Sequence, residues 1–312
     1  MPIELSEYRD RVIGQCEKVI VGKQDVIRKV LISFLCSGHI LVEDVPGTGK
    51  TMLLRTFAAV IGGSFKRVQC TPDLLPSDLS GINFYNQKTG EFQFRPGPVF
   101  ANLVLADEVN RATPRTQSAL LEAMAERQIT VDGETHALPD PFMIMATQNP
   151  LESHGTFPLP EAQTDRFFMR LSLGYMERSQ EVSVLTGTDP AETLASLSAQ
   201  ITAEDTAAAK RFVRETEVTH DVAEYLMDII AATRADSRIR IGVSTRGALA
   251  LYAASQAAAA LDGRRYVTPE DVKAMAPSVL SHRLVMSVTG KASESEAVIT
   301  ELAENCRVPM EQ

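Results

Sequence analysis

The sequence predicts an α/β fold in which a parallel sheet with flanking helices is followed by a smaller all-helical domain. An apolar strand near Leu41 runs into a glycine-rich turn and a helix, and a second apolar strand ends in adjacent acids at 107–108. Strand-like runs then disappear after residue 174. Strands that alternate with helices favour a parallel sheet. We therefore expect a core over 1–173, a linker over 174–190 and a helical domain over 191–312.

The glycine-rich turn is typical of a loop that binds phosphate. Backbone N–H groups of such a turn and of the following helical turn converge on an anion. Lys50 would pair with the β- and γ-phosphates, and the Thr51 hydroxyl would ligate Mg²⁺. Asp44 stands where this pattern usually has its first glycine, so a strand–turn–helix junction of another α/β protein is the alternative. The predicted phosphate-binding residues are Pro46, Gly47, Thr48, Gly49, Lys50, Thr51 and Met52.

Polar side chains end two further strands. Asp107 and Glu108 follow the apolar run 103–106, and adjacent carboxylates at the end of a buried strand are costly unless they meet cations or water. In a nucleotide site Asp107 would hold Mg²⁺ opposite Thr51, and Glu108 would polarise the attacking water. Asn149 follows the run 142–148 and could orient that water. The alternative readings are a strand end in solvent and an ordinary turn residue before proline.

Two hairpins are predicted between these strands. The first spans 81–94 around a Lys-Thr-Gly turn. The second spans 129–136, where Asp-Gly separates two alternating segments. A helix over 114–126, with Thr113 as its cap and proline in its first turn, comes directly before the second hairpin. A plain surface hairpin is the alternative for each.

The C-terminal part of the sequence is rich in helical patterns. Apolar residues from Val222 to Ile230 recur at helical spacing and predict one buried face. A second helix is expected over 246–261, where Asp-Gly ends it. Arg246 begins that helix, and Arg166 lies near the end of a short helix after Pro160. Taken alone, each arginine would most often form a surface salt bridge.

Composition limits the function classes. The 312 residues are 44% hydrophobic and 23% charged, as in an ordinary globular protein. Lys and Arg number 31 against 40 Asp and Glu, and the resulting charge of −9 makes nucleic acid an unlikely partner. Four scattered cysteines and five histidines without ligand spacing argue against a disulfide scaffold or a zinc site. The N-terminus lacks a signal-peptide pattern and no apolar run is membrane-spanning, so we expect a cytoplasmic protein without membrane insertion.

The order of these motifs resembles that of AAA+ ATPases, and the detailed strings resemble the MoxR family. These strings are Glu-Asp-Val-Pro-Gly at 43–47, Ala-Asp-Glu-Val-Asn-Arg-Ala at 106–112, Thr-Gln-Ser-Ala-Leu-Leu-Glu-Ala-Met at 116–124 and Pro-Glu-Ala-Gln at 160–163. The resemblance covers nearly the whole chain. It implies an AAA+ αβα P-loop core, in which the hairpins are the helix-2 insert and the pre-sensor hairpin, and a helical lid. It also accounts for Asp44, since the family commonly has Glu-Asp-Val-Pro-Gly there.

The resemblance further implies roles for the remaining residues. Arg246 looks like the sensor 2 arginine, which supplies positive charge to the nucleotide of its own subunit, although Thr245-Arg-Gly departs from the more usual Pro-Arg-Ala. Arg166 would reach the next subunit as an arginine finger. Val21 and Gly22 match the segment that faces adenine. The rivals for the finger role are Arg111, Arg115 and Arg170.

The function implied by the resemblance is that of a chaperone-like remodeller driven by ATP and Mg²⁺. It would act as a homo-oligomeric ring, taken as an ATP-promoted hexamer, alongside a partner with a von Willebrand factor A domain. Two alternatives of the same AAA+ branch remain open: a nucleic-acid motor, and a metal-insertion motor similar to magnesium chelatase. The client protein, and whether it is threaded through the ring, are not predicted.

Overall fold

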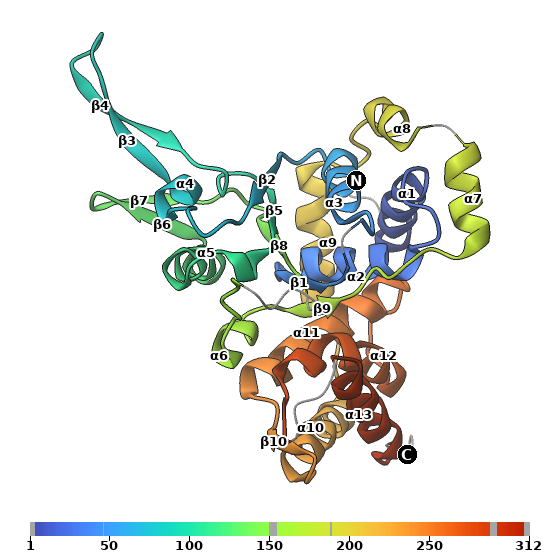
Figure 1. Cartoon of the computed structure of the whole chain (residues 1–312). Coiled ribbons are helices and arrows are strands. Elements are labelled where there is room, and N and C mark those ends of the chain that lie inside the picture. Colours follow the sequence, from blue (N-terminus) through green and yellow to red (C-terminus); the bar gives the residue numbers. More distant parts are fainter. Residues whose placement is uncertain (1–3, 46, 150–154, 188, 288–291, 309–312) are drawn as a thin grey trace.

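Five parallel strands form the central sheet of this computed structural model, which describes residues 4–45, 47–149, 155–187, 189–287 and 292–308. The strand order is β2-β5-β8-β1-β9 (Figure 1). This confirms the predicted α/β class with a parallel sheet. The strands are β1 (Ile40–Glu43), β2 (Phe65–Gln69), β5 (Leu103–Asp107), β8 (Met143–Gln148) and β9 (Met169–Leu171).

Helices cover both faces of the sheet. Successive side chains of a strand point to opposite sides, so the apolar strands present hydrophobic residues on both faces, and both must be covered. On one face Ile40 and Val42 pack into a hydrophobic cluster that takes in three helices of the core and continues into the C-terminal helices. On the other face Leu41 packs into a second cluster with α5. The first face carries α1 (Leu5–Glu17), α2 (Gln24–Leu35) and α3 (Lys50–Val60). The second carries α4 (Pro76–Ser80), the 3₁₀ turn η1 (Val109–Arg111) and α5 (Pro114–Glu126), and α6 (Glu161–Thr164) follows β8.

The predicted helix 114–126 is confirmed with the same bounds, and the side chain of Thr113 accepts a hydrogen bond from the Thr116 N–H, as expected of its cap. Both predicted hairpins are also confirmed: β3 (Gly81–Asn86) pairs with β4 (Glu91–Pro96), and β6 (Gln128–Val131) pairs with β7 (Glu134–Ala137). In the second turn Asp132 and Gly133 have φ values of 50° and 88°, the left-handed geometry of the tightest hairpins.

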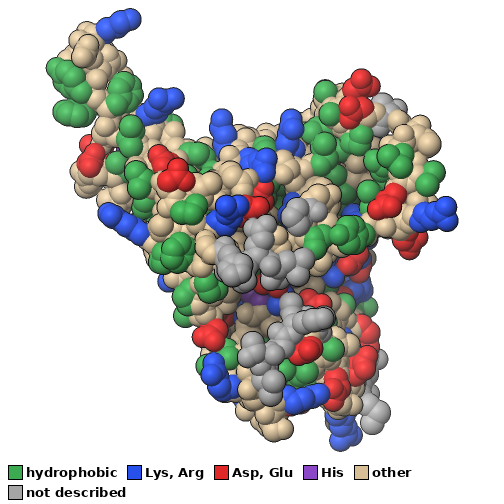
Figure 2. Space-filling view, in the orientation of Figure 1, with side chains coloured by type: hydrophobic (Ala, Val, Ile, Leu, Met, Phe, Trp, Pro, Cys, Tyr) green, Lys and Arg blue, Asp and Glu red, His purple; other side chains and the backbone are tan. Residues whose placement is uncertain are grey.

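The two hairpins project from the same side of the core (Figure 1). They touch each other, because the ring of Phe94 stacks on His136 with centroids 4.0 Å apart and Asn83 donates to Asp132 at 2.9 Å. Apolar side chains are exposed along the longer hairpin (Figure 2), and Tyr85 and Phe92 are 55% and 73% exposed.

The rest of the chain is helical apart from two short strands. The sequence predicted no strand here, but β10 (Ile239–Ile241) and β11 (Val285–Met286) pair antiparallel. The predicted linker range contains α7 (Arg178–Thr186) and the start of α8 (Pro190–Ser196). The other elements are α9 (Ala203–Glu215), α10 (His220–Ala235), α11 (Thr245–Leu261), α12 (Pro269–Leu280), the 3₁₀ turn η2 (Ser281–Arg283) and α13 (Ala292–Asn305). Across the described residues, no helix is both long and apolar enough to span a membrane.

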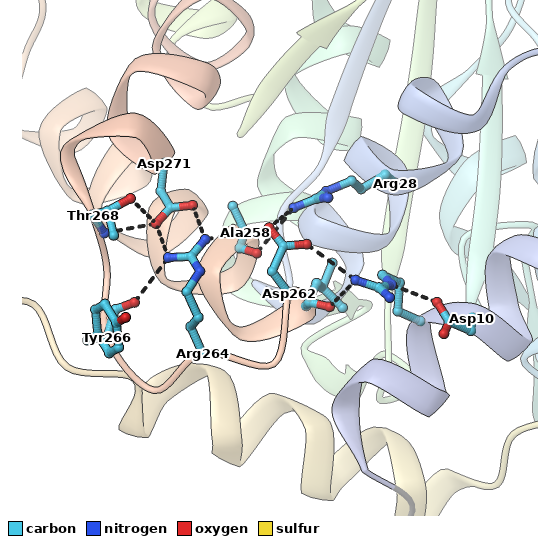
Figure 3. A network of polar contacts seen from close by, with 10 residues as sticks. Asp10, Arg28, Ala258, Asp262, Arg264, Tyr266, Thr268 and Asp271 are labelled. Carbon is cyan, nitrogen blue, oxygen red and sulfur yellow. Dashed lines mark hydrogen bonds and ion pairs between the residues drawn. The ribbon is translucent and has the colours of Figure 1, made fainter.

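The C-terminal helices are fastened to the N-terminal ones by two arginines (Figure 3). Asp262 caps the C-terminus of α11, where its negative charge is opposed by the helix dipole. Arg9 of α1 and Arg28 of α2 bind this carboxylate at 3.3 Å and 2.9 Å, and Arg28 also donates to the Ala258 carbonyl at 3.2 Å. The two guanidinium groups thus supply both the charge and the donors that the end of α11 lacks.

His39, directly before β1, joins three elements inside the core. Its Nδ1 accepts from the Ile144 N–H of β8 at 2.9 Å, so its Nε2 carries the proton and donates to the Met124 carbonyl of α5 at 3.1 Å. Burial lowers the pKa of His39 to about 4 from its ordinary 6.5, although the bond to Met124 opposes that shift. The fold therefore requires the neutral imidazole.

We predict that His39 makes the fold sensitive to mild acid. In the unfolded chain His39 is protonated below about pH 6.5, whereas in the folded chain it is protonated only below about pH 4. The free energy of unfolding therefore falls as the pH is lowered from 6.5 to 4. The contribution is about 1.4 kcal/mol for each pH unit. Urea unfolding at pH 7 and pH 5 should show a smaller pH dependence in His39→Gln than in the wild type. The control His220→Gln alters an exposed histidine and should keep the wild-type dependence. An unchanged dependence in His39→Gln would contradict the assignment.

Candidate nucleotide site

A cavity of about 460 Å³ lies at the carboxyl edge of the sheet, where β1, β5 and β8 end. Most of the predicted site residues line it together. They are Gly47, Thr48, Gly49, Lys50, Thr51, Met52, Asp107, Glu108 and Asn149. Pro46 lies outside the described residues. The structure thus brings the glycine-rich loop and the polar strand ends to one place, as expected when the carboxyl ends of parallel strands meet at the same edge.

The glycine-rich loop has the backbone that an anion site needs. Gly47 and Gly49 have φ values of 84° and 89°, which residues other than glycine rarely adopt. A Cβ built on either glycine would meet no described atom within 4 Å, so the loop borders open space. Lys50 begins α3, and its ammonium group lies 2.8 Å from the Val45 carbonyl. An N-terminal helix end and an ammonium group therefore face the same cavity.

Thr147 of β8 organises the two carboxylate residues. Its hydroxyl donates to the Asp107 carboxylate at 2.6 Å and accepts the Glu108 N–H at 2.8 Å. Glu108 has φ 56° and ψ 51°, a left-handed conformation that costs a residue with a Cβ about 1–2 kcal/mol. This turn directs the Glu108 side chain into the cavity directly after Asp107, so both carboxylates serve one space.

Two residues of β2 also contact these carboxylates, and the sequence analysis did not identify them. Arg67 pairs with Asp107 at 2.6 Å, and Gln69 donates to Glu108 at 2.9 Å. Arg111 pairs with the same oxygen of Glu108, Oε2, at 3.2 Å. Arg67 and Gln69 stand at alternate positions of β2, and Gln69 is in register with Asp107 of β5. The alternation of polar residues at 67 and 69 was the available signal, but its meaning depends on β2 lying next to β5.

The residues of the cavity fit a magnesium ion that is shared with phosphate. The Thr51 hydroxyl and the Asp107 carboxylate line the same cavity, and both offer the oxygen ligands that Mg²⁺ prefers. The described residues contain no cluster of three or more His, Cys, Asp or Glu side chains suited to a metal. An ion here would take its remaining ligands from phosphate oxygens and water, which is how Mg²⁺ is usually bound.

The two predicted arginines lie elsewhere, and they lie together. Arg166 and Arg246 line a second cavity of about 330 Å³ beside the end of α5, and neither lines the first. Arg246 is 60% exposed and pairs with Asp165 at 3.4 Å. Its role at the nucleotide of its own chain stays a prediction. Val21 and Gly22 do not line the first cavity either.

The three other arginines considered for the finger role differ in their burial and in their bonding partners. Arg170 is buried and bonds to Glu43 at 3.3 Å and Ser281 at 2.9 Å, so its guanidinium is committed inside its own chain. Arg111 is committed to Glu108. Arg115 is exposed on α5 and lines a cavity formed with the hairpins.

Asp165, the residue before Arg166, joins the core to the lid helices. Its carboxylate accepts from Arg283 at 3.0 Å, from Ser244 at 3.2 Å and from Arg246. Arg283 is buried, with 2% of its side chain exposed, and also donates to the Phe167 carbonyl at 2.6 Å. Burial lowers the pKa of Arg283 to about 10, and the charge of Asp165 opposes this shift. The guanidinium therefore stays charged at neutral pH.

Comparisons with known proteins agree with this fold and site. Residues 39–169 match the profile of the "ATPase family associated with various cellular activities (AAA)", and residues 231–302 match an AAA lid domain. A 2.00 Å crystal structure of a Cytophaga hutchinsonii protein, proposed to be an ATPase, superposes with a TM-score of 0.87 at 36% identity, covering 98% of this chain and 97% of that one. The fold and the site define an AAA+ ATPase.

Relatives over most of the chain name the family. "Chaperone MoxR1" of Mycobacterium tuberculosis is 40% identical over 96% of this chain and 82% of its own length. "Protein MoxR" of Paracoccus denitrificans is 34% identical over 86% of each chain, and YeaC of Bacillus subtilis, an uncharacterized protein, is 45% identical over 99% and 97%. The chain belongs to the MoxR family of AAA+ ATPases.

We predict that the two arginines bound to Asp165 differ sharply in their effect on stability. Arg283→Met leaves a carboxylate without its buried partner and should lower the free energy of unfolding by about 3–5 kcal/mol. Arg246→Met removes an exposed partner of the same carboxylate and should cost less than about 1 kcal/mol. Urea unfolding followed by circular dichroism measures both. Equal losses in the two variants would show that burial does not decide the strength of these pairs.

Proposed function

We propose that this MoxR-family chain hydrolyses Mg-ATP in the cavity at the sheet edge and uses the energy to remodel other proteins. The observation that carries the proposal is the convergence of the phosphate-type loop, Asp107 and Glu108 on one space. Hydrolysis builds negative charge on the γ-phosphoryl oxygens, so the reaction needs fixed positive charge and an oriented water. This cavity holds residues suited to both tasks.

The site residues that the sequence predicted each have a role in the proposed reaction. The loop that Pro46 opens cradles the phosphates through the backbone N–H groups from Gly47 to Met52. Lys50 moves from the loop carbonyls to the β- and γ-phosphates. Thr51 and Asp107 hold Mg²⁺, which neutralises developing charge when it is bound. Glu108 takes the proton of the attacking water, and Asn149 orients that water by a hydrogen bond.

Arg166 and Arg246 act, in this proposal, on the nucleotide of a neighbouring copy in a ring. Their shared position beside Asp165, away from the phosphate loop of their own chain, supports this assignment. Two positive side chains on one surface of a subunit can complete the cavity of the next, and an arginine supplied in this way can raise the rate by about 10³–10⁵. We take the ring to be a hexamer. Val21 and Gly22 face adenine in the proposal.

The chaperone role rests on the family. One relative is named "Chaperone MoxR1", and we extend that role to this chain, which would act in the cytosol with a partner that carries a von Willebrand factor A domain. We keep the division into a core over 1–173, a linker over 174–190 and a lid over 191–312 as part of the proposal. Bound DNA, or a chelatase-type large subunit, would be the mark of the two alternative motors.

We predict that Glu108→Gln traps clients in the presence of Mg-ATP. Loss of the general base should slow hydrolysis by about 10²–10⁴ while the phosphate loop stays intact. Lys50→Ala is the matched control, because it should lose nucleotide binding. Both variants would be affinity-purified from cell extract with Mg-ATP, and the retained molecules identified. Proteins that Glu108→Gln retains and Lys50→Ala does not support the remodeller. Retained DNA instead would move the function to the nucleic-acid motor.

We further predict that mixing inactive variants restores ATP hydrolysis. Arg166→Ala and Lys50→Ala should each be inactive alone, but a mixed ring pairs an intact phosphate loop from the first variant with Arg166 of the second. The same holds for Arg246→Ala mixed with Lys50→Ala if Arg246 acts on a neighbour. If Arg246 serves its own chain, that second mixture stays inactive, and the shared role of the two arginines is rejected.

A further inference from the structure

Asp44 occupies the position of the loop where a glycine is usual, and its carboxylate accepts hydrogen bonds from three backbone N–H groups. Asp44 is buried, with 7% of the residue exposed. One carboxylate oxygen accepts the Val45 N–H at 2.9 Å, and the other accepts the N–H groups of Leu173 at 2.8 Å and Gly174 at 3.0 Å. Asp44 is not among the residues with positive φ, so the backbone at this position does not require glycine. The phosphate loop is therefore bonded directly to the chain that leaves β9.

The same stretch of chain is held from a second side by Lys23. We call residues 173–175 the exit segment, because they follow β9 and lead to α7. The Lys23 ammonium donates to the carbonyls of Leu173 at 2.5 Å, Gly174 at 3.3 Å and Tyr175 at 2.8 Å. Asp44 thus satisfies N–H groups of the exit segment and Lys23 satisfies its carbonyls. Charged partners on both sides make these strong hydrogen bonds.

Of the two residues of this clamp, Asp44 lines the nucleotide cavity, and Lys23 belongs to the segment that the proposed function assigns to adenine. Lys23 follows Val21 and Gly22, and a Cβ on Gly22 would collide with the side chain of Gln180 on α7. Asp44 also offers its own carbonyl to the Lys50 ammonium at 3.4 Å. One residue is therefore bonded through its backbone to the phosphate-binding lysine and through its side chain to the exit segment.

We propose that Asp44 and Lys23 are positioning residues that couple nucleotide occupancy to the exit segment and α7. This inference rests on the proposed nucleotide site. When Lys50 turns to phosphate it releases the Asp44 and Val45 carbonyls, and the backbone of Asp44 adjusts. Because the carboxylate of the same residue is bonded to Leu173 and Gly174, that adjustment reaches the exit segment. The segment leads into α7 and on to the lid helices, so it is the covalent route by which the loop can move them.

The decisive variant is Asp44→Gly, which restores the usual glycine of the loop and removes the clamp. If the Asp44 side chain had no role beyond filling this loop position, the change should leave both the Kd for ATP and kcat unaltered. We expect the Kd for ATP to stay within about threefold of the wild type, while kcat falls about tenfold, a split that marks loss of coupling rather than of binding. Hydrogen exchange of the Leu173 and Gly174 amides should speed up about tenfold or more, and added ATP should no longer change it.

Two further variants and one control make the test more specific. Asp44→Asn keeps the volume of the side chain and at least one acceptor, so it should show a smaller effect of the same kind. Lys23→Met removes the donor on the other side and should also speed exchange in the exit segment. Asp73→Gly, in an exposed loop, is the control for adding a glycine and should behave as the wild type.

The outcomes separate the two proposals. Wild-type exchange at Leu173 and Gly174 in Asp44→Gly would overturn the clamp, and so would a joint loss of ATP binding and kcat like that of Lys50→Ala. A wild-type chain that binds no ATP would overturn the proposed nucleotide site instead, while exchange without nucleotide still decides whether Asp44 holds the exit segment.

Discussion

The hydroxyl of Thr147 is the interaction on which the rest of the site depends. It stands at the end of β8, between β1 with the phosphate loop and β5 with the carboxylates. By donating to Asp107 and accepting from the Glu108 backbone, it fixes the two acidic residues relative to each other and to the loop. A hydroxyl can do both because it is donor and acceptor at once. The strand order therefore matters to the chemistry as much as the motifs themselves do.

Two kinds of contact join the lid helices to the core. One hydrophobic cluster runs without a break from the sheet through α1, α2 and α3 to α9, α11 and α12. Ion pairs stand at its rim, with Asp262 held by Arg9 and Arg28, and Asp165 held by Arg283. The apolar cluster resists separation through the area it keeps from water, whereas the ion pairs fix orientation. Any motion of the lid must work against both.

Much of the site could be predicted because its residues directly follow apolar strands, and parallel strands end at one edge whatever their order. Asp107, Glu108 and Asn149 are of this kind, whereas Lys50 and Thr51 open the helix after the glycine-rich turn that follows β1. The site contacts that the sequence could not predict depend on which strands and helices lie side by side in the fold. The partners Arg67 and Gln69 require β2 to lie next to β5, and the place of Arg246 requires α11 to dock beside Asp165. The carboxylate of Asp44 looked like an irregularity in the loop because its bonding partners lie about 130 residues further along the chain.

The left-handed backbone at Glu108 makes the stability of the fold and the proposed activity depend on different residue types at one position. A glycine there would adopt the same φ without steric cost and would make the fold easier to form. It would also remove the carboxylate that we propose as the general base, so selection for a stable fold and selection for the proposed reaction favour different residues. Strain of this kind persists only where the surrounding bonds over-determine the backbone, as Thr147 does here. Thermostable variants chosen for folding alone would be expected to lose function first at this residue.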